Sequence, residues 1–521
     1  MSQTNHKSQK EHAYLLDNTE PQAVWRHFEE LSAIPRCSQN EAAVLDYVRS
    51  FADSLGLTCK QDSVGNICIK KGASPGYENR PGMIIQGHLD MVCEKNEGKI
   101  HDFSSDPLKL IREGDWLRAD DTTLGADNGI GVAMALAALE DPSLEHPPLE
   151  ALLTVDEESG LTGAMALDPS IVDGRILINL DSEDPDAFYI GCAGGMHTTG
   201  TYSIVKEKAA PGAVCFKLAV TGLKGGHSGG DIHLGLGNSL RLGGRVLFNL
   251  LKEGTLHLGE IRGGSKHNAI PREFFCTFTF TPKTLQNPAS GPASKETREA
   301  AHTIAENVIK AIEEEFSSKE PGLSIRLTNL DAPETPEELF SADFSSTVIR
   351  SLLSIPHGVE QMSTAMPGLV ETSSSLAAVW TDPQKSKLTI LTSQRSSIME
   401  AAHGMSDRVE AAMLEGGARV IKTNHYPAWT PDPESPFLAA CKDVFKTQTG
   451  REAKIKAIHA GLECGVIGDK FKNHPVPMQM ISFGPEMKEI HTPQERLNIP
   501  SVKRTWDILT GILVQGRNKN P

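Results

Sequence analysis

The stretch TVDEESG, residues 154–160, runs from an apolar segment directly into three acidic residues and a glycine. Residues 149–155 are rich in leucine and β-branched types, which predicts a buried strand that stops at Asp156. An isolated acidic triplet is usually a solvated turn, because carboxylates prefer water. Acidic and histidine residues elsewhere in the chain decide whether this reading holds.

Three other segments place such residues at the ends of predicted elements. QGHLDMV puts His88 and Asp90 at the exit of a strand, and INLDSE puts Asp181 at the end of another. In LGADNGIG, Asp127 lies where a glycine-rich turn meets a helix. The carboxyl ends of strands in an open α/β sheet share one edge, where ligands bind. We therefore expect these side chains to meet the acidic residues of TVDEESG in one crevice.

A cluster of carboxylates in a partly desolvated crevice repels itself by several kcal/mol, so it needs cations. Imidazole and carboxylate ligands suit Zn²⁺, with Mn²⁺ and Co²⁺ as alternatives, and a set without cysteine favours a catalytic site over a structural one. Taken singly, His88 would be a satisfied structural histidine, and Asp127 or Asp181 a cap or turn residue. The joint pattern predicts a divalent metal site.

The order of these motifs resembles the M20 metallopeptidases. The resemblance rests on GHLD, GADNGIG, the DEE stretch, NLD and a late IHTPQE, whose order, spacing and flanking residues match together. It covers nearly the whole chain, and it is most similar to the aminoacyl-histidine dipeptidase branch, also called cytosol non-specific dipeptidase. The resemblance implies a metal-dependent dipeptidase of broad, Xaa-His type specificity.

The same resemblance implies two zinc ions held by five side chains of this sequence. Asp127 would bridge the ions. The remaining ligands would be His88 and Asp181 for one ion, and Glu158 and His491 for the other.

Two further residues of the motifs would act beside the ligands. Asp90 matches the family residue that orients the imidazole of His88. Glu157 matches the general base, which would activate a metal-bridging water and then pass its proton to the leaving amine. Neighbouring residues on a strand point to opposite sides, so different roles for Glu157 and Glu158 require a bend there, which Gly160 could help to form.

The predicted elements indicate two domains. The first 200 residues alternate strand and helix, which is typical of an α/β domain with a mostly parallel sheet, and the middle of the chain reads as antiparallel strands with helices. His491 can reach the site only if the chain returns to the first domain. We therefore expect a di-zinc catalytic domain of residues 1–197 and 398–521, interrupted by an inserted α+β lid of residues 198–397.

The resemblance implies four substrate-contacting residues. His227 in LKGGHSGGDIH would stabilise the oxyanion, and Asn268 and Arg395 would hold the substrate's C-terminal carboxylate. Gly461 would let the backbone approach the substrate. A structural histidine and an ordinary surface pairing are the alternatives for His227 and Arg395. Nearby histidines without an assigned role are His197, His233, His267 and His459.

Rival functions fit the sequence less well. GHSGG matches G-x-S-x-G, so a serine hydrolase using Ser228 is an alternative, but a glycine-rich loop follows where that motif needs a helix. An inactive metal-binding protein is disfavoured, because a structural metal needs no unliganded base such as Glu157. A tripeptidase, carboxypeptidase or deacylase of the same family remains open, since the lid sets that choice.

The length and composition of the chain indicate its domain number, its partners, its location and the state of its cysteines. A chain of 521 residues with a formal net charge of −16 is expected to fold as two or three domains and not to bind nucleic acid. No apolar stretch approaches the ~20 residues that span a bilayer, and the N-terminus has no apolar signal region, so we expect a cytoplasmic protein. Nine cysteines without C-x-x-C predict mostly reduced, buried thiols. The resemblance also implies a possible homodimer.

Overall fold

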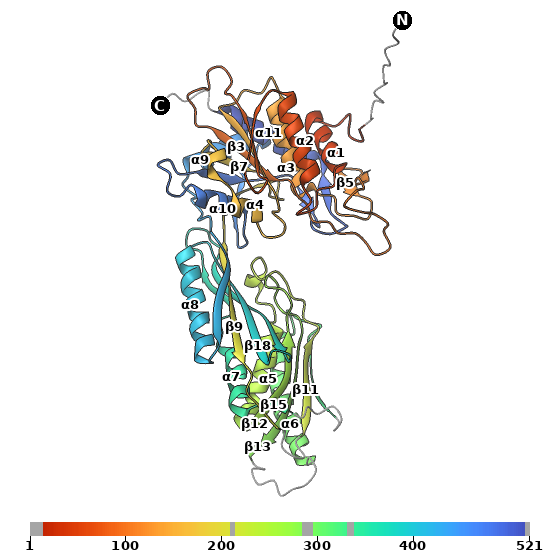
Figure 1. The fold of residues 1–521 in the computed structure, drawn as a ribbon, viewed down its shortest axis with the longest axis vertical. Helices are drawn as coiled ribbons and strands as arrows, with labels where there is room; N and C mark the ends of the chain where they lie inside the picture. Colours follow the sequence, from red (N-terminus) through yellow and green to blue (C-terminus); the bar gives the residue numbers. More distant parts are fainter. Residues whose placement is uncertain (1–13, 209–213, 284–294, 331–337, 516–521) are drawn as a thin grey trace. The chain divides into compact units, whose positions relative to one another are not determined.

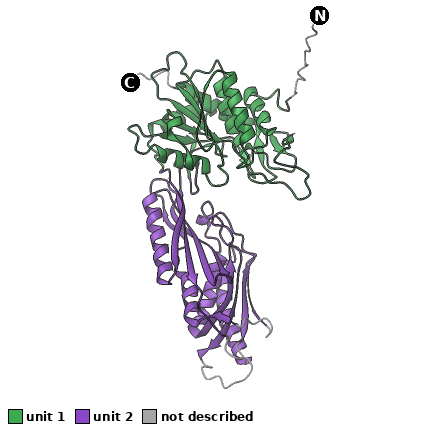
Figure 2. Ribbon diagram, viewed as in Figure 1, with its two compact units in different colours: residues 1–191, 431–457, 462–521 green, residues 192–430, 458–461 purple. Residues whose placement is uncertain are grey.

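The computed structural model describes residues 14–208, 214–283, 295–330 and 338–515. The N-terminal residues 1–13, which enter the prediction that no signal region is present, lie outside these ranges. The described chain forms two compact units, coloured separately in Figure 2. Unit 1 contains residues 1–191, 431–457 and 462–521, and unit 2 contains residues 192–430 and 458–461.

Unit 1 is built on an eight-stranded sheet, labelled in part in Figure 1. Its four central strands are parallel, and antiparallel neighbours flank them on both sides. The strands in spatial order are β1 (Thr58–Gln61), β2 (Ile67–Lys71), β6 (Leu149–Thr154), β3 (Met83–His88), β7 (Ile176–Asn179), β21 (Gln479–Ser482), β8 (Ala187–Cys192) and β20 (Lys454–Ile458).

Helices cover this sheet because its central strands are apolar on both faces, as parallel strands require. Helix α3 (Ala126–Glu140) consists mainly of small and apolar residues and packs against β3, β6 and α1 (Gln22–Ser32). The other helices of the unit are α2 (Ala42–Ser54), α4 (Thr162–Ala166), α9 (Pro436–Thr449), α10 (Glu463–Lys470) and α11 (Ile499–Val514). A small separate sheet joins β4 (Leu110–Glu113), β5 (Trp116–Ala119), β22 (Met487–Lys488) and β23 (Arg496–Asn498).

Unit 2 contains a nine-stranded antiparallel sheet against which four helices pack. A large apolar core lies between the helices and the sheet. The strands are β14 (Ser324–Asn329), β11 (Cys215–Thr221), β13 (Phe274–Pro282), β12 (Gly254–Gly263), β17 (Val370–Asp382), β18 (Lys387–Ser396), β9 (Gly194–Ser203) and β19 (Arg419–Tyr426), with β16 (Gly358–Met362) beside β17. The helices are α5 (Ser239–Glu253), α6 (Lys295–Phe316), α7 (Ala342–Ser354) and α8 (Met399–Glu415). The short strands β10 (Lys206–Lys208) and β15 (Glu338–Phe340) form a separate pair.

The unit boundaries differ from the predicted ones. The predicted return to the catalytic domain at residue 398 is too early, because α8 and β19 belong to unit 2. β19 pairs antiparallel with β9 and so extends the sheet of unit 2, and α8 packs against β9 and β18. Pairing of strands so distant in the sequence leaves no local mark in the residues themselves.

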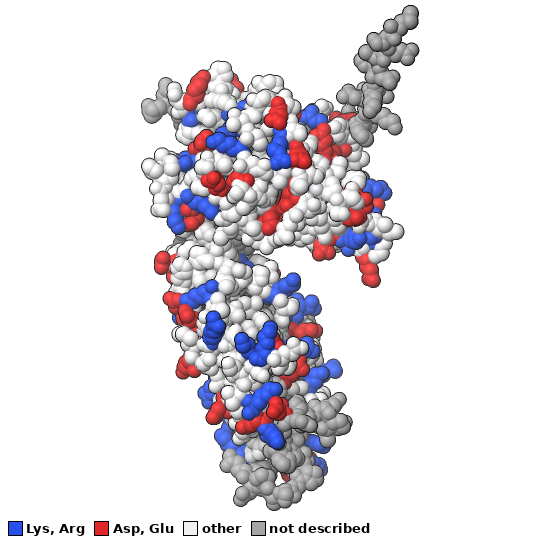
Figure 3. Space-filling view, in the orientation of Figure 1, with Lys and Arg blue, Asp and Glu red and all other residues white. Residues whose placement is uncertain are grey.

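Within the described residues, no helix is both long and apolar enough to cross a membrane. On the face drawn in Figure 3, acidic and basic side chains are intermixed over both units.

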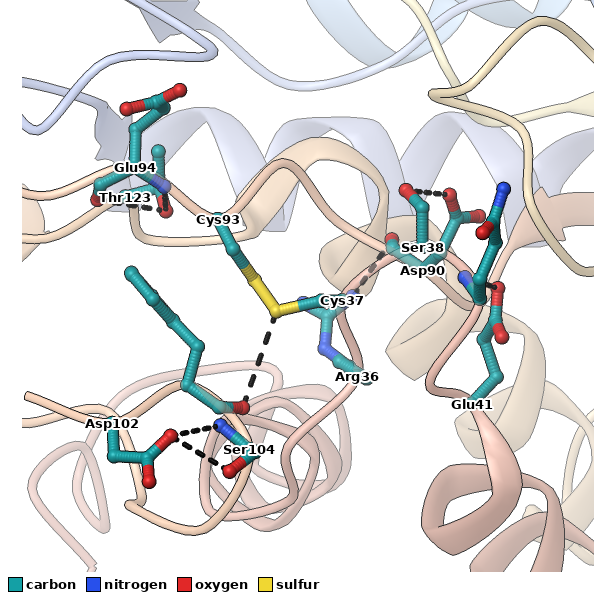
Figure 4. Close-up of a disulfide and its surroundings, with 12 residues drawn as sticks. Arg36, Cys37, Ser38, Glu41, Asp90, Cys93, Glu94, Asp102, Ser104 and Thr123 are labelled. Atoms are coloured by element: carbon teal, nitrogen blue, oxygen red, sulfur yellow. Dashed lines mark hydrogen bonds between the residues drawn. A yellow bond between two sulfur atoms is a disulfide. The ribbon is translucent and has the colours of Figure 1, made fainter.

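One pair of cysteines is bonded, which the sequence did not predict. Cys37 and Cys93 form a disulfide, shown in Figure 4. They are separated by 56 residues, and a parallel bridge between Cys37 and Met91 brings the two segments together. The other seven cysteines are not disulfide-bonded, and all of them except Cys59 are buried. Reduced, buried thiols are therefore the correct description of most cysteines but not of this pair.

Reduction of the Cys37–Cys93 bond should destabilise unit 1. Opening a loop of 56 residues restores conformational entropy to the unfolded chain, which corresponds to about 4 kcal/mol of the free energy of unfolding. We expect dithiothreitol to lower the denaturant midpoint of the wild type, with no such effect on the double variant Cys37→Ser/Cys93→Ser. Equal midpoints of the wild type with and without reductant would contradict this prediction.

Candidate metal centre

The ends of three parallel strands form one edge of the site in unit 1. β3 ends at His88, which lies in register with Thr154 at the end of β6. β7 ends at Asn179, two residues before Asp181. The acidic residues that follow β6 and β7 therefore emerge beside His88, as the strand-end pattern predicts.

Asp127 approaches the same edge from the start of α3. Gly125 has a φ of +65°, and Asp127 and Asn128 depart from helical backbone angles. The Asn128 side chain donates a hydrogen bond to the Leu180 carbonyl (2.7 Å), which ties this turn to the segment after β7. The irregular turn directs the Asp127 carboxylate out of the helix and towards the strand ends.

The two oxygens of Asp127 face two different imidazoles. Oδ1 lies 3.0 Å from His88 Nε2, and Oδ2 lies 3.0 Å from His491 Nε2. His88 Nε2 is also 3.4 Å from Asp181 Oδ1, and His491 Nε2 is 3.1 Å from Glu158 Oε2. Asp127 is thus shared by two groups of three potential ligands.

These two groups fit a pair of metal ions. Ligand atoms bound tetrahedrally to zinc at about 2 Å are separated by about 3.3 Å, which matches the separations around both imidazoles. Glu158 Oε1 is buried and has no hydrogen-bond partner, so a ligating role is open to it. His88, Glu157 and Glu158 form a further group close enough to share an ion. The donors are imidazole and carboxylate only, as in catalytic zinc sites.

Burial makes this cluster costly without cations. Burial raises the pKa of Asp181 well above its ordinary value, and nearby Asp127 adds to the effect. Hydrogen bonds to Asp127 and Glu158 raise the pKa of His491 to about 11. Burial alone would lower the pKa of His88, but the surrounding carboxylates, Asp181 first, raise it well above its usual range. The geometry therefore favours positive charge at both imidazole positions, whether from protons or from metal ions.

Asp90 fixes the orientation of His88. His88 Nδ1 lies 3.1 Å from the Asp90 carbonyl and 3.4 Å from Asp90 Oδ1. A proton on Nδ1 satisfies these oxygens and leaves the Nε2 lone pair directed at the cluster. The Ser38 hydroxyl donates to Asp90 Oδ2 (2.7 Å), a contact drawn in Figure 4. Burial raises the pKa of Asp90, but the hydrogen bond and charge of His88 together with hydrogen bonds from Glu157 and Ser38 outweigh this effect, and the pKa falls to about 2.

Asp90 also holds the backbone that separates the two glutamates. Its carboxylate accepts the N–H groups of Glu157 (3.0 Å) and Glu158 (3.1 Å). β6 ends at Thr154, and Asp156 has a φ of +51°, so the chain turns immediately before the pair. The required bend is therefore centred on Asp156, with Gly160 at a φ of +129° further on.

The Glu157 carboxyl group lies in a desolvated position. Burial raises the pKa of Glu157 well above its ordinary value, and Asp181, Glu463 and Glu158 act in the same direction, against His88. A carboxyl group with a raised pKa can hold and release a proton near neutral pH. Glu157 lies outside both groups that contain Asp127.

Sequence reasoning missed one buried carboxyl group beside this site. Glu463, the first residue of α10, is fully buried and accepts from Thr154 Oγ1 (2.7 Å) and Gln86 Nε2 (2.5 Å). Its Oε1 has no partner, and burial raises its pKa. The signal was present, since a lone acidic residue stands inside the apolar GLECGVIG segment. Two further residues that sequence reasoning missed, Arg36 and Glu495, support the Asp127 turn.

The four predicted substrate-contacting residues all belong to unit 2. The loop that carries His227 pairs with the loop that carries Asn268, through the Ser228 N–H and the Asn268 carbonyl (2.7 Å). A side chain at Gly229 would clash with the His459 carbonyl and with Arg395, so glycine allows the His227 loop to lie against both. Residues 458–461, which end at Gly461, also belong to this unit.

His227 is fixed as a neutral hydrogen-bond donor. Its Nδ1 accepts the backbone N–H of Gly230 (2.9 Å), so the proton of the neutral ring is on Nε2. Burial, assisted by the charge of Arg395, lowers the pKa of His227 to about 4. At neutral pH this side chain can therefore donate from Nε2 to a developing oxyanion.

Arg395 is a buried cation without a carboxylate partner among the described residues. It is 6% exposed, and Nη1 donates to the Tyr426 hydroxyl (2.7 Å), while Nε has no partner. Burial and then Arg395 lower the pKa of His459 to about 3. A buried guanidinium with neutral imidazoles nearby and no carboxylate partner among the described residues is suited to binding an anion. An ordinary surface pairing does not describe this arginine.

The serine-hydrolase alternative lacks its required geometry. Ser228 is buried, and its hydroxyl faces the carbonyl of His267 at 3.5 Å rather than an imidazole nitrogen. β11 ends at Thr221, several residues earlier, and the next element after Ser228 is the short 3₁₀ turn Ile232–Leu234 rather than a helix. The nucleophile elbow needs a strand and a helix directly on either side.

Known proteins resemble this chain over nearly its whole length. The chain is 36% identical to the cytosol non-specific dipeptidase of Escherichia coli K12 over 96% of its length and 98% of that protein. The crystal structure of aminoacylhistidine dipeptidase from Vibrio alginolyticus superposes with a TM-score of 0.84, at 36% identity, covering 96% of this chain and 98% of the other. A tripeptidase from Staphylococcus aureus shares the fold, with a TM-score of 0.53 and 15% identity, over 96% of this chain and all of that one.

The model of peptidase family M20/M25/M40 matches residues 84–515, a range that includes all five proposed metal ligands. The chain belongs to this family.

Proposed function

We propose that this protein is a metal-dependent dipeptidase of broad specificity that accepts Xaa-His dipeptides. The observation that carries the proposal is the single carboxylate, Asp127, shared by two groups of ligands beside the protonatable Glu157. Both relatives at 36% identity are named as dipeptidases, one as non-specific and one as acting on aminoacyl-histidine. Their coverage of nearly the whole chain supports carrying the substrate class over.

The metals that we propose are two zinc ions, with Mn²⁺ or Co²⁺ as substitutes. His88 and Asp181 would hold one ion, Glu158 and His491 the other, and Asp127 both. When bound, such a pair supplies Lewis acidity to a carbonyl group and to water. Five side chains from strand ends, a helix start and a distant turn thereby become a preorganised site.

Glu157 is the proposed proton carrier. As a carboxylate it accepts a proton from the attacking water, and as an acid it donates that proton to the leaving amine. The raised pKa of Glu157 favours this protonated form, because burial and the nearby negative charge disfavour the carboxylate. The Asp90 carboxylate accepts the backbone N–H of Glu157 and so keeps Glu157 in place, which makes Asp90 a positioning residue.

Unit 2 is proposed to bind the rest of the substrate. The Nε2–H of His227 would stabilise the oxyanion, and Arg395 with Asn268 would hold the C-terminal carboxylate. Gly461 would leave room for the substrate beside the backbone. A carboxylate requirement favours short peptides with a free C-terminus over internal bonds of long chains.

We propose a cytosolic location and a possible homodimer, in keeping with the name of the Escherichia coli relative and with the family resemblance. A disulfide such as Cys37–Cys93 is uncommon in that compartment, so thiol trapping in cell lysates is informative about its state there.

Activity should require metal and should be confined to dipeptides. Protein stripped with a chelator is expected to be inactive and to recover on addition of Zn²⁺, Mn²⁺ or Co²⁺, assayed with a dipeptide library that includes Xaa-His members. The matched tripeptides and N-acyl amino acids should turn over at least about tenfold more slowly. Preference for tripeptides or N-acyl substrates would instead favour a related amidohydrolase.

The variant Glu157→Gln should lose turnover but keep its metals. Loss of a general base lowers kcat by roughly 10³-fold or more, whereas both Asp127-centred groups stay intact. Metal content by mass spectrometry and kcat on one dipeptide provide the two readings. Glu97→Gln, an exposed change in the same unit, is the control and should match the wild type. Near-normal kcat in Glu157→Gln would remove this residue from its role.

Arg395→Met should abolish the preference for a free carboxylate. A charge-assisted hydrogen bond contributes about 1.5–3 kcal/mol, so kcat/KM for dipeptides should fall by roughly 10- to 100-fold. The wild type should prefer a dipeptide to its C-terminal amide, and the variant should treat the two alike. An undiminished preference in Arg395→Met would assign carboxylate binding to another group.

A further inference from the structure

The turn that carries Asp127 is held through its backbone by a buried carboxylate. Glu495 is 2% exposed, and its two oxygens accept from four consecutive N–H groups. Oε2 accepts from Leu124 (2.8 Å) and Gly125 (3.0 Å), and Oε1 accepts from Ala126 (2.8 Å) and Asp127 (3.4 Å). Four donors on one carboxylate fix the direction of every peptide in the turn.

A buried guanidinium holds the same turn through a carbonyl. Arg36, 2% exposed, donates from Nη2 to the Gly125 carbonyl. Its Nη1 donates to the carbonyls of Leu89 (3.0 Å) and Asp90 (3.1 Å). Arg36 therefore links the Asp127 turn to the segment that orients His88. Figure 4 shows Arg36 beside Ser38 and Asp90 on this side of the site.

One peptide group is bonded to both residues. The unit between Gly125 and Ala126 is trans, so its carbonyl and N–H point in opposite directions. The carbonyl meets Arg36 and the N–H meets Glu495, which places a positive charge at the negative end of the peptide dipole and a negative charge at its positive end. Hydrogen bonds arranged in this way polarise and strengthen one another.

The packing leaves this peptide little freedom. A Cβ at Gly125 would lie 2.6 Å from Arg36 Nη2 and 2.6 Å from Met91 Sδ, and one at Gly129 would lie 2.5 Å from Arg36 Nη2. The positive φ of Gly125 also disfavours any other residue. The guanidinium thus fills the space that two glycines provide.

Glu495 also connects the turn that contains His491 to the turn that carries Asp127. It lies four residues after His491, and its N–H donates to the Thr492 carbonyl (3.0 Å) within the same turn. One turn therefore supplies a proposed ligand and the anchor of the shared ligand. Displacement of Glu495 would move His491 and Asp127 relative to each other.

We propose that Arg36 and Glu495 are positioning residues that clamp the Gly125–Ala126 peptide and thereby hold the Asp127 carboxylate between its two imidazole partners. The proposal rests on the two-metal site described under the proposed function. Its consequence is that both metal positions depend on two side chains that touch neither ion. Loss of a supporting group of this kind lowers metal affinity by about 10- to 100-fold.

The test compares metal binding by the purified full chain carrying Glu495→Gln, Arg36→Met, or both changes. Zinc affinities at buffered free zinc are expected to fall about 10- to 100-fold at both positions in each single variant. The double variant should lose less than the product of the single losses, because both act through one peptide. Glu489→Gln, an exposed change in the same turn, is the matched control and should bind like the wild type.

A second reading separates positioning from general destabilisation. The Co²⁺-loaded variants, compared at full occupancy, should show altered visible absorption, because the ligand geometry around Asp127 has changed. Glu495→Asp and Arg36→Lys keep the charges and provide the same comparison if the first variants do not fold. Wild-type affinities and an unchanged cobalt spectrum in the folded variants would overturn the proposal. A wild-type chain that binds fewer than two ions would instead contradict the proposed function.

Discussion

The carboxylate of Asp127 has an imidazole nitrogen 3.0 Å from each of its oxygens, and the rest of the site depends on this arrangement. Buried like charges repel by several kcal/mol, so the neighbouring carboxylates can gather only around cations. Asp127 is the one ligand that both proposed ions would share, because it belongs to both groups. Its placement therefore determines whether the cluster forms one centre or two unrelated acidic patches.

The strand-end pattern predicted much of this site, because ends of parallel strands meet at one edge and local sequence reveals where strands stop. His88 and Asp181 follow from that rule, whereas His491 lies in a turn at a φ of +61° and was identified only by family resemblance. Arg36 and Glu495 act on backbone groups, which no side-chain pattern reports. The two-domain α/β and α+β architecture was likewise predicted, but strand pairings between distant segments set the boundary and could not be.

Each unit, taken by itself, contains buried charge of one sign. The centre in unit 1 is a buried excess of carboxylates that requires cations, and unit 2 buries the guanidinium of Arg395 without a carboxylate partner among the described residues, which favours an anion. The lowered pKa values of His227 and His459 keep both imidazoles neutral, so they add no positive charge to that of Arg395. The first suits a carbonyl group and the second a carboxylate, and a dipeptide, the proposed substrate, contains both groups.

Anomalous scattering from crystals of the zinc-loaded protein tests the central claim most directly. The account predicts two peaks at the zinc absorption edge, roughly 3.5–4 Å apart, on either side of the Asp127 carboxylate. One peak would be adjacent to His88 and Asp181, and the other adjacent to Glu158 and His491. A single peak at saturating zinc, or two peaks that do not share Asp127, would contradict it.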